Sequence, residues 1–256
     1  MRQSKSAINH LKNKKVDPES EVKDFCPSFD IRFSYFLINF LKVAGFKNLA
    51  KKIPFSYKKF WNQRYKQYGF DIMYCGNKGR TKKQNFERRM KKIEALSKFM
   101  KKLNVNSNFS VLDIGCGVGI FTNFFFKNRF KNYKGIDLTK GVINNLKNKF
   151  PRYNFKQRDI GKDAIDGTYD LIIMISVTQH IINDKHFKFA MNNIQNSLNK
   201  NGLFLVTDMA NVDRRDSLYT RRRPLSYYKK NINELKFIDM MDFEGGLSLF
   251  CFRKIK

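Results

Sequence analysis

The sequence has few acidic residues, few prolines and few glycines, and each shortage excludes a class of protein or narrows its partners. Against 51 Lys and Arg, the 256 residues include 22 Asp and Glu, which gives a formal charge of +29. A positive charge of this size affects the solubility of the protein and the kind of partner it attracts, and it does not determine the fold. With 5 prolines, 14 glycines and 42% hydrophobic residues, the chain is neither collagen-like nor disordered.

Cysteines and long apolar runs are also scarce. The four cysteines lie far apart without a Cys-x-x-Cys pair, so neither a zinc site nor a disulfide framework is indicated. The longest apolar stretch, Ser34 to Leu41, is much shorter than the roughly 18 residues that span a bilayer. The first 28 residues are polar and charged, unlike a secretory leader. We expect a cytoplasmic protein that binds no metal.

The positive charge is unevenly distributed. Residues 1–108 hold 26 Lys and Arg against 8 Asp and Glu, whereas residues 109–256 hold 25 against 14. We therefore expect a basic face on the first part of the chain. A genome rich in A and T would also enrich Lys, Asn, Ile and Phe, so both a ligand and a compositional bias stay open as explanations.

From residue 109 onward, short apolar runs alternate with amphipathic ones, a pattern typical of βα units on a mainly parallel sheet. Strands are predicted over residues 110–114, 133–136, 153–157, 169–175, 203–207, 237–243 and 247–253. Helices are predicted over residues 120–128, 142–149, 184–198 and 226–235, with Asn201-Gly202 ending the third. The last two strands meet at Gly245-Gly246 without room for a crossover helix, so they must form an antiparallel hairpin.

The front third of the chain lacks this alternation. A helix or helix pair is predicted over Phe29–Lys52, and aromatic and basic residues follow over residues 53–69. Apolar residues recur every three or four positions from Phe86 to Leu103, which predicts an amphipathic helix leading into the first strand. We predict an α/β domain at residues 86–256 with a basic helical N-terminal cap at residues 1–85.

The strongest motif is VLDIGCGVGIFT, at residues 111–122. An apolar strand that includes Asp113 is followed by Gly115, Gly117 and Gly119 and then by a helix, so a ligand can lie against bare backbone. The dinucleotide fingerprint G-x-G-x-x-G needs a glycine where this chain has Ile120. A P-loop is excluded because no Gly-Lys-Ser/Thr follows.

The pattern D-x-G-x-G-x-G resembles motif I of the class I S-adenosylmethionine-dependent methyltransferases. The resemblance implies an α/β, Rossmann-like doubly wound seven-stranded sheet, in the order 3-2-1-4-5-7-6 with the seventh strand antiparallel. It also implies S-adenosyl-L-methionine as the cofactor. It covers residues 86–256 and touches residues 60–65, which are similar to a W-x-x-R-Y element found ahead of the core in some members.

Further segments match the family in the same order. Asp137 follows the second strand, where the family places a carboxylate on the ribose diol. Asp159 resembles the acceptor of the adenine amino group, and the backbone N–H of Ile160 resembles the donor to a ring nitrogen. The cofactor-binding residues that the resemblance implies are Asp113, Gly115, Cys116, Gly117, Gly119, Asp137, Leu138, Asp159, Ile160 and Ser176.

Residues for the acceptor side are expected on three segments. His180 follows the fourth strand, where it either acts as a catalytic base or packs against the next helix. Trp61 and Arg64 either cover the site or anchor the cap. Arg222 and Arg223, in an Arg-Arg-Arg-Pro run, either bind an acidic substrate or form a solvated surface.

Two acceptor classes stay open. The first is an O or N atom on a small molecule, sugar or lipid. The alternative is RNA, because basic residues interleaved with aromatics over residues 57–68 can track phosphates and stack bases. The chain has no recognisable RNA-binding module and no Asn-Pro-Pro-Tyr-type motif. A non-enzymatic cofactor-binding scaffold and attraction of Phe29–Lys52 to an anionic membrane surface are further hypotheses.

Overall fold

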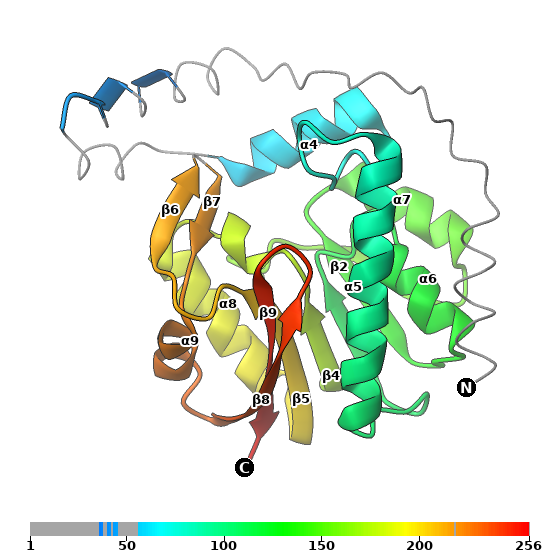
Figure 1. Cartoon of the computed structure of the whole chain (residues 1–256). Coiled ribbons are helices and arrows are strands. Elements are labelled where there is room, and N and C mark those ends of the chain that lie inside the picture. The colour runs from blue at the N-terminus through cyan, green and yellow to red at the C-terminus, as the bar shows by residue number, and fades with distance from the viewer. Residues whose placement is uncertain (1–35, 38–39, 42, 46–55, 218, 256) are drawn as a thin grey trace.

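A seven-stranded sheet forms the centre of the computed structural model, which describes residues 36–37, 40–41, 43–45, 56–217 and 219–255 (Figure 1). The helix or helix pair expected over Phe29–Lys52 falls almost wholly outside the described residues. The strands of the sheet are β1 (Val111–Ile114), β2 (Tyr133–Asp137), β3 (Asn154–Gln157), β4 (Tyr169–Met174), β5 (Leu198–Asp208), β8 (Leu235–Phe243) and β9 (Leu247–Lys254).

The strand order is β3-β2-β1-β4-β5-β9-β8, and β8 and β9 are the sixth and seventh strands of this sheet in the chain. The pairs among β1 to β5 are parallel, whereas β9 runs antiparallel to both β5 and β8. The predicted Rossmann-like order with an antiparallel seventh strand is therefore confirmed. Parallel strands covered on both faces need apolar side chains on both, which explains the nearly continuous apolar runs in β1 and β4.

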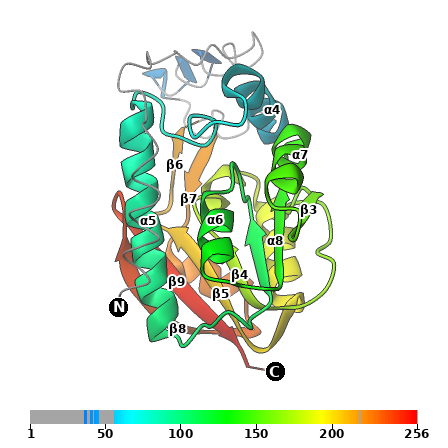
Figure 2. The same ribbon diagram turned by 90° about the vertical axis from the view of Figure 1, so that its right-hand side faces the viewer.

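Helices cover the two faces of the sheet (Figures 1 and 2). The helices are α4 (Tyr57–Tyr68), α5 (Lys82–Lys102), α6 (Ile120–Lys127), α7 (Lys140–Lys149), α8 (Asp184–Asn196) and α9 (Leu225–Asn231). Buried side chains of α5, α6 and α7 share one core cluster with Val111 of β1, and those of α8 and α9 share a second with Leu112 and Ile114. Successive residues of β1 therefore point to opposite layers.

Two helix ends differ from the prediction. α5 begins four residues before Phe86 because Thr81 and Gln84 form a capping box. The predicted domain division between residues 85 and 86 therefore falls inside α5, and the division itself stays a prediction. α8 ends at Asn196, so the expectation that Asn201-Gly202 ends this helix is wrong. These two residues lie inside β5, which starts early because Leu198 pairs with Tyr169 of β4.

A small hairpin that the sequence pattern did not predict lies beside α4 at one end of the molecule (Figure 1). It consists of β6 (Arg214–Ser217) and β7 (Thr220–Arg222), which pair antiparallel. The Tyr219 ring, in the turn of this hairpin, stacks on Phe60 of α4 with the ring centroids 4.5 Å apart. The hairpin and α4 thus form a continuous roof over the carboxyl ends of the central strands.

Asp113 faces the packed layer of α5 to α7 and does not line a cavity. Its carboxylate accepts a hydrogen bond of 2.7 Å from the Tyr133 hydroxyl, which lies 2.8 Å from the Thr122 hydroxyl. Burial raises the pKa of Asp113 to about 7. The prediction that Asp113 contacts the cofactor is therefore wrong, because the alternation of β1 sends its side chain into the core while Ile114 points to the other layer.

We predict that Asp113→Asn changes the pH dependence of stability. Because the folded-state pKa is raised, the native carboxyl contributes fully below about pH 4, and its ionisation destabilises the fold as the pH rises to 7. From pH 4 to pH 8 the variant should gain on the order of 2 to 4 kcal/mol relative to wild type in urea unfolding. Asp166→Asn is the control, because salt bridges lower the pKa of Asp166 and its weak effect should have the opposite sign. A difference for Asp113→Asn that is independent of pH would contradict the assignment.

Candidate active site

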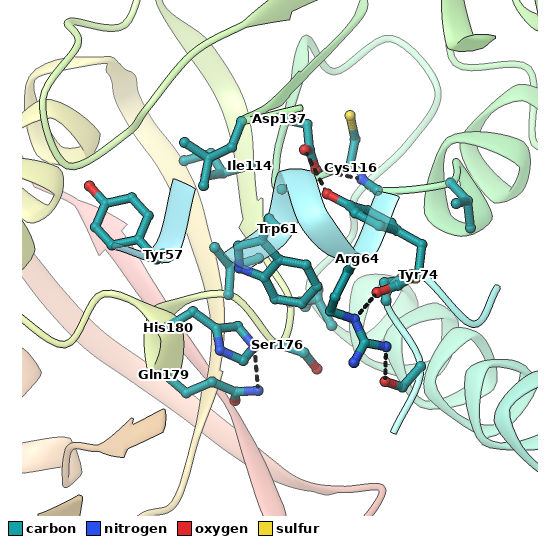
Figure 3. A pocket seen from close by; sticks show the side chains of 18 of the residues that line it. Tyr57, Trp61, Arg64, Tyr74, Ile114, Cys116, Asp137, Ser176, Gln179 and His180 are labelled. Atoms are coloured by element: carbon teal, nitrogen blue, oxygen red, sulfur yellow. Dashed lines mark hydrogen bonds between the residues drawn. The ribbon is translucent and has the colours of Figure 1, made fainter. Parts of the chain in front are cut away.

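A cavity of about 440 Å³ lies beneath α4, at the carboxyl ends of the central strands (Figure 3). The predicted site residues that line it are Trp61, Arg64, Gly115, Cys116, Gly117, Leu138, Asp137, Asp159, Ile160, Ser176, His180 and Arg222. Three predicted residues, Asp113, Gly119 and Arg223, do not line it. The structure thus brings twelve of the fifteen predicted site residues, from distant segments of the chain, together around one cavity.

The glycine turn after β1 places bare backbone at the cavity wall. Gly115 has a φ of +74°, and a Cβ there would lie 2.4 Å from Val177, so no other residue fits without movement. The N–H groups of Gly115 and Cys116 both donate to the carbonyl of Ile136, at 2.8 and 3.1 Å. These bonds hold the turn against the end of β2.

Gly119 has a different role from the one predicted. It is the N-cap residue of α6, with a φ of +79°, and a Cβ there would lie 2.6 Å from Leu146 of α7. The glycine therefore permits close packing of α6 against α7. Gly119, which was predicted to contact the cofactor, is not among the residues that line the cavity.

Asp137, at the end of β2, presents a buried carboxylate to the cavity. It accepts hydrogen bonds from the backbone N–H groups of Gly117 (3.1 Å) and Thr139 (3.0 Å) and from the Tyr74 hydroxyl (3.3 Å). Burial raises its pKa, and none of the ion pairs among the described residues includes it. A carboxylate surrounded by neutral donors has acceptor capacity left for ligand hydroxyls.

Asp159, after β3, connects the cavity to α4. The Tyr57 hydroxyl donates to both carboxylate oxygens, at 2.9 and 2.8 Å, and the N–H of Gly161 donates to one of them at 3.1 Å. Burial and the Asp159 carboxylate raise the pKa of Tyr57, which stays protonated as a donor. The sequence analysis did not assign Tyr57 to the cofactor end of the site, because nothing in the sequence indicates which turn of α4 faces Asp159.

Trp61 of α4 lies between the two ends of the cavity (Figure 3). Its ring packs edge to face with Tyr74, at 5.4 Å, and with His180, at 5.0 Å. Arg64, one turn later, lines the cavity but donates to the backbone carbonyls of Met73, Tyr74 and Gly76. Burial lowers the pKa of Arg64, and these bonds fix the loop between α4 and α5 as one wall of the site.

His180 lies in η1 (Thr178–His180), directly below the roof. Its Nδ1 lies 2.9 Å from the carbonyl oxygen of Tyr219, and because that oxygen can only accept, Nδ1 carries the proton. The unprotonated Nε2 lies 3.3 Å from the side-chain amide of Gln179. Burial, followed by the charges of Arg222, Arg64 and Arg89, lowers the pKa of His180 to about 4. The imidazole is therefore neutral at pH 7, with Nε2 as an acceptor.

Lys92 of α5 is a cavity residue that the sequence analysis did not select. It is 7% exposed, and its Nζ donates to the Ser176 hydroxyl at 2.7 Å. Burial and the neighbouring Arg89 lower the pKa of Lys92 to about 7. A signal was present in the sequence, because Lys92 adjoins Ile93 and lies four residues before Leu96 on the apolar stripe of this helix.

Arg222 and Arg223, the two arginines predicted to bind the substrate, have different surroundings in the structure. Arg222 lines the cavity and donates to the side chain of Gln179 at 2.6 Å. Arg223 is fully buried outside the cavity lining. It donates a hydrogen bond to Asp184 at 3.1 Å and lies 4.3 Å from the Phe187 ring centroid. The prediction that Arg223 binds substrate is wrong, because neighbouring residues of an extended strand point to opposite sides.

The donor and acceptor groups of the cavity fit an adenosyl cofactor. The glycine turn leaves room for a ligand against the backbone, Asp137 can accept from a ribose diol, and Asp159 with Ile160 can bind an adenine edge. Among the described residues, no group of three or more His, Cys, Asp or Glu could hold a metal ion. Within the same part of the chain, no helix has the length and apolar character needed to cross a bilayer.

Comparisons with known proteins point to methyltransferases. The family model described as "Methyltransferase domain" matches residues 78–250. The N-methyltransferase NodS from Bradyrhizobium japonicum WM9, solved with S-adenosyl-L-homocysteine, has a TM-score of 0.54 and 16% identity over 87% of this chain and 99% of its own. An S-adenosylmethionine-dependent methyltransferase from Clostridium acetobutylicum has a TM-score of 0.54 and 17% identity over 66% and 92%. At these identities, the two structures show a shared fold.

One sequence relative is the protein 235L of Invertebrate iridescent virus 6, provisionally named as a methyltransferase. It is 31% identical over 103 residues, which span 40% of this chain and 39% of the viral protein. The match of the family model covers most of the chain and includes the glycine turn, Asp137 and His180. The chain therefore belongs to the methyltransferase domain family, that is, to the class I S-adenosylmethionine-dependent methyltransferases with a Rossmann-like fold.

Proposed function

We propose that the protein transfers a methyl group from S-adenosylmethionine to an O or N atom on a small molecule, sugar or lipid. The observation that carries this proposal is a single roofed cavity with two chemically different ends. Asp137 and Asp159 belong to the ends of β2 and β3, whereas His180 follows β4 and Lys92 bonds Ser176 of the same loop after β4. A volume of about 440 Å³ is in the range of small-molecule sites.

When bound, S-adenosylmethionine supplies a methyl group on a sulfonium, which is already electrophilic. Asp137 holds the ribose hydroxyls, and Asp159 with the N–H of Ile160 holds the adenine edge. The α4 roof and the β6–β7 hairpin exclude water above the reacting atoms. The main contribution of the chain is to align the acceptor atom with the methyl group, and such positioning is worth up to roughly 7 to 11 kcal/mol.

His180 orients the acceptor in this proposal. With a pKa of about 4, its neutral imidazole is a weak base. Nε2 exchanges its 3.3 Å contact with the Gln179 amide for an N–H or O–H hydrogen bond from the acceptor. The carbonyl of Tyr219 fixes this tautomer. The edge-to-face contact with Trp61 restricts the plane of the imidazole ring. An acceptor nitrogen that is nucleophilic when neutral suits this arrangement better than a hydroxyl that must first lose its proton.

The RNA alternative loses its main support. It requires the aromatic side chains of residues 57–68 to lie on an accessible basic face, where bases can stack. Tyr57 and Phe60 are instead 9% and 2% exposed, and Trp61 packs inside the cavity between Tyr74 and His180. These side chains form the roof of the cavity.

The direct test is transfer of labelled methyl from S-adenosylmethionine into a total cell extract, followed by separation into RNA, lipid, protein and small-molecule fractions. We expect the label in the small-molecule or lipid fraction, and none of it without enzyme. Label confined to RNA or to protein would contradict the proposed acceptor class. Comparison with the His180→Ala variant controls for contaminating activities.

Asp137→Asn should weaken the binding of S-adenosylhomocysteine, measured by calorimetry, by about 10- to 100-fold, because a charged acceptor of two hydroxyl hydrogen bonds is lost. Asp113→Asn is the matched control, since this carboxylate is on the neighbouring strand but faces the core. It should bind S-adenosylhomocysteine with wild-type affinity. Equal affinities for wild type and Asp137→Asn would remove Asp137 from the cofactor site.

His180→Ala should lower the rate of label transfer at least tenfold and leave the affinity for S-adenosylhomocysteine within about twofold, because in this proposal Nε2 binds the acceptor and not the cofactor. In the wild type, the rate should show no loss with a pKa near 6.5, since protonation of His180 begins only near pH 4 to 5. Gln179→Ala is the control for removal of a neighbouring polar side chain. A normal rate in His180→Ala would exclude the role proposed for the imidazole.

A further inference from the structure

The charges that line the cavity are strongly unbalanced. Two acidic residues, Asp137 and Asp159, face seven basic ones. The basic lining residues are Arg64, Lys78, Arg88, Arg89, Lys92, Arg158 and Arg222. A positive wall of this kind in a largely enclosed space attracts an anion, because the low dielectric strengthens each interaction.

Three of these basic residues have carboxylate partners. Arg88 forms two hydrogen bonds with Glu244, Arg158 pairs with Asp166, and Arg222 pairs with Asp216 at 3.1 Å. Each of these charges is therefore offset within the protein. They shape the cavity wall but leave little net charge for a ligand.

Arg89 and Lys92, one turn apart on α5, differ from these three. Arg89 donates to the backbone carbonyl of Cys75, and Lys92 donates to the Ser176 hydroxyl. Both partners are neutral, and no ion pair found in the described part of the chain includes Arg89 or Lys92. Because Lys92 is 7% exposed, water cannot replace the missing counter-ion.

The positive potential reaches both walls of this end of the cavity. The charge of Arg89 contributes to lowering the pKa of Lys92 on α5 and also that of His180 on the opposite loop. An anion bound between these groups would reverse both effects. The Glu244 carboxylate, which Arg88 binds, raises the pKa of Lys92, but burial and Arg89 outweigh it. A bound anion would therefore stabilise the charged form of Lys92.

The position of the pair points to the acceptor side. Asp137 and Asp159 follow β2 and β3, at one edge of the sheet. Lys92 lies 5.8 Å from the Phe243 ring centroid of β8, and Gly245 of the β8–β9 turn and Leu247 of β9 also line the cavity. The Nζ of Lys92 itself bonds Ser176, two residues after β4, and β1 separates β4 from β2 and β3 in the sheet order.

We propose that Arg89 and Lys92 form a subsite for an acidic group, a carboxylate or a phosphate, carried by the methyl acceptor. The inference deepens the proposed function and rests on it. It names the acceptor as an anionic small molecule whose acidic group binds on α5 while its N–H or O–H faces Nε2 of His180. A carboxylate is also present on the cofactor, so the experiment separates the two sources.

Sulfate is the probe, because it is an anion whose charge is constant between pH 5 and 9. The full chain, saturated with S-adenosylhomocysteine, is titrated with sulfate at constant ionic strength set by chloride. Trp61, the single tryptophan of the sequence, reports binding by its fluorescence from inside the cavity. We expect saturable sulfate binding by wild type. Absence of a saturable change in wild type would overturn the proposal without any variant.

Arg89→Gln and Lys92→Met should each weaken sulfate binding at least tenfold. Lys98→Gln is the matched control, because Lys98 is on the same helix with its side chain 69% exposed, and it should bind like wild type. Thermal unfolding of each variant checks that the fold is retained. Sulfate affinities that are equal in wild type and both subsite variants would overturn the assignment.

Sulfate binding should also depend on pH through Lys92. With a pKa of about 7, Lys92 is charged below that pH and neutral above it, so binding should weaken from pH 6 to pH 8. The charged and titratable groups that act on Lys92 are Arg88 and Arg89 of α5, Glu244 of the β8–β9 turn and Cys75 of the loop between α4 and α5. Lys92→Met should lose this dependence. Its persistence in the variant would exclude Lys92 as the responsible group.

Comparison of S-adenosylhomocysteine with 5′-methylthioadenosine, which lacks the carboxylate, identifies the source of the anion. If the pair binds the acceptor, Arg89→Gln and Lys92→Met should bind both nucleosides like wild type. Weaker binding of S-adenosylhomocysteine alone would assign the subsite to the cofactor and overturn the acceptor assignment. Failure of the wild type to bind either nucleoside would contradict the proposed function itself, which is a different result.

Discussion

The hydrogen bond from the N–H of Gly117 to Asp137 is the interaction on which the cavity depends. It joins the turn after β1 to the end of β2, and the neighbouring N–H groups of Gly115 and Cys116 bind the carbonyl of Ile136 beside it. Gly115 and Gly117 both have positive φ values, +74° and +52°, which glycine adopts without strain, and a Cβ at residue 115 would collide with Val177. The backbone of the glycine turn therefore lies next to the buried carboxylate of Asp137, at the carboxyl ends of β1 and β2.

The roof of the cavity is held by contacts at both ends of α4. Tyr57 bonds Asp159 after β3, and Arg64 bonds the carbonyls of the loop that precedes α5. Between them, Phe60 stacks on Tyr219 of the β6–β7 hairpin. Each contact joins α4 to a different segment of the cavity wall, so the closure of the site and the position of His180 under Tyr219 depend on one another. The roof explains the buried residues Tyr57, Phe60 and Arg64 of α4.

The sheet and the cofactor end were predictable because their signals are local and periodic. Apolar runs, turn glycines and acidic residues that follow strands sit at fixed positions in the chain, and the parallel arrangement brings the strand ends together. Asp137, Asp159 and the turn at residues 115–117 line the cavity for this reason. The antiparallel pairing of β8 and β9 followed from the short Gly245-Gly246 connection.

Side-chain direction and tertiary contacts were less predictable. Asp113 and Arg223 have the right residue types beside the site, yet strand alternation turns both away from it, and Gly119 serves the packing of α6 on α7. Tyr74 reaches Asp137 across 63 residues, a contact without any local signal. Lys92 lies on a helix whose apolar stripe was recognised, but only the fold shows that this stripe passes the cavity.

The most direct test of the central claim uses Trp61, whose ring lies between Tyr74, which bonds Asp137, and His180. Titration of the full chain with S-adenosylhomocysteine should change the emission of this single tryptophan saturably, with one ligand bound per chain. Adenosine should compete with the ligand, because it carries the same ribose diol and adenine edge. An emission spectrum that does not respond to S-adenosylhomocysteine at millimolar concentration would contradict the account.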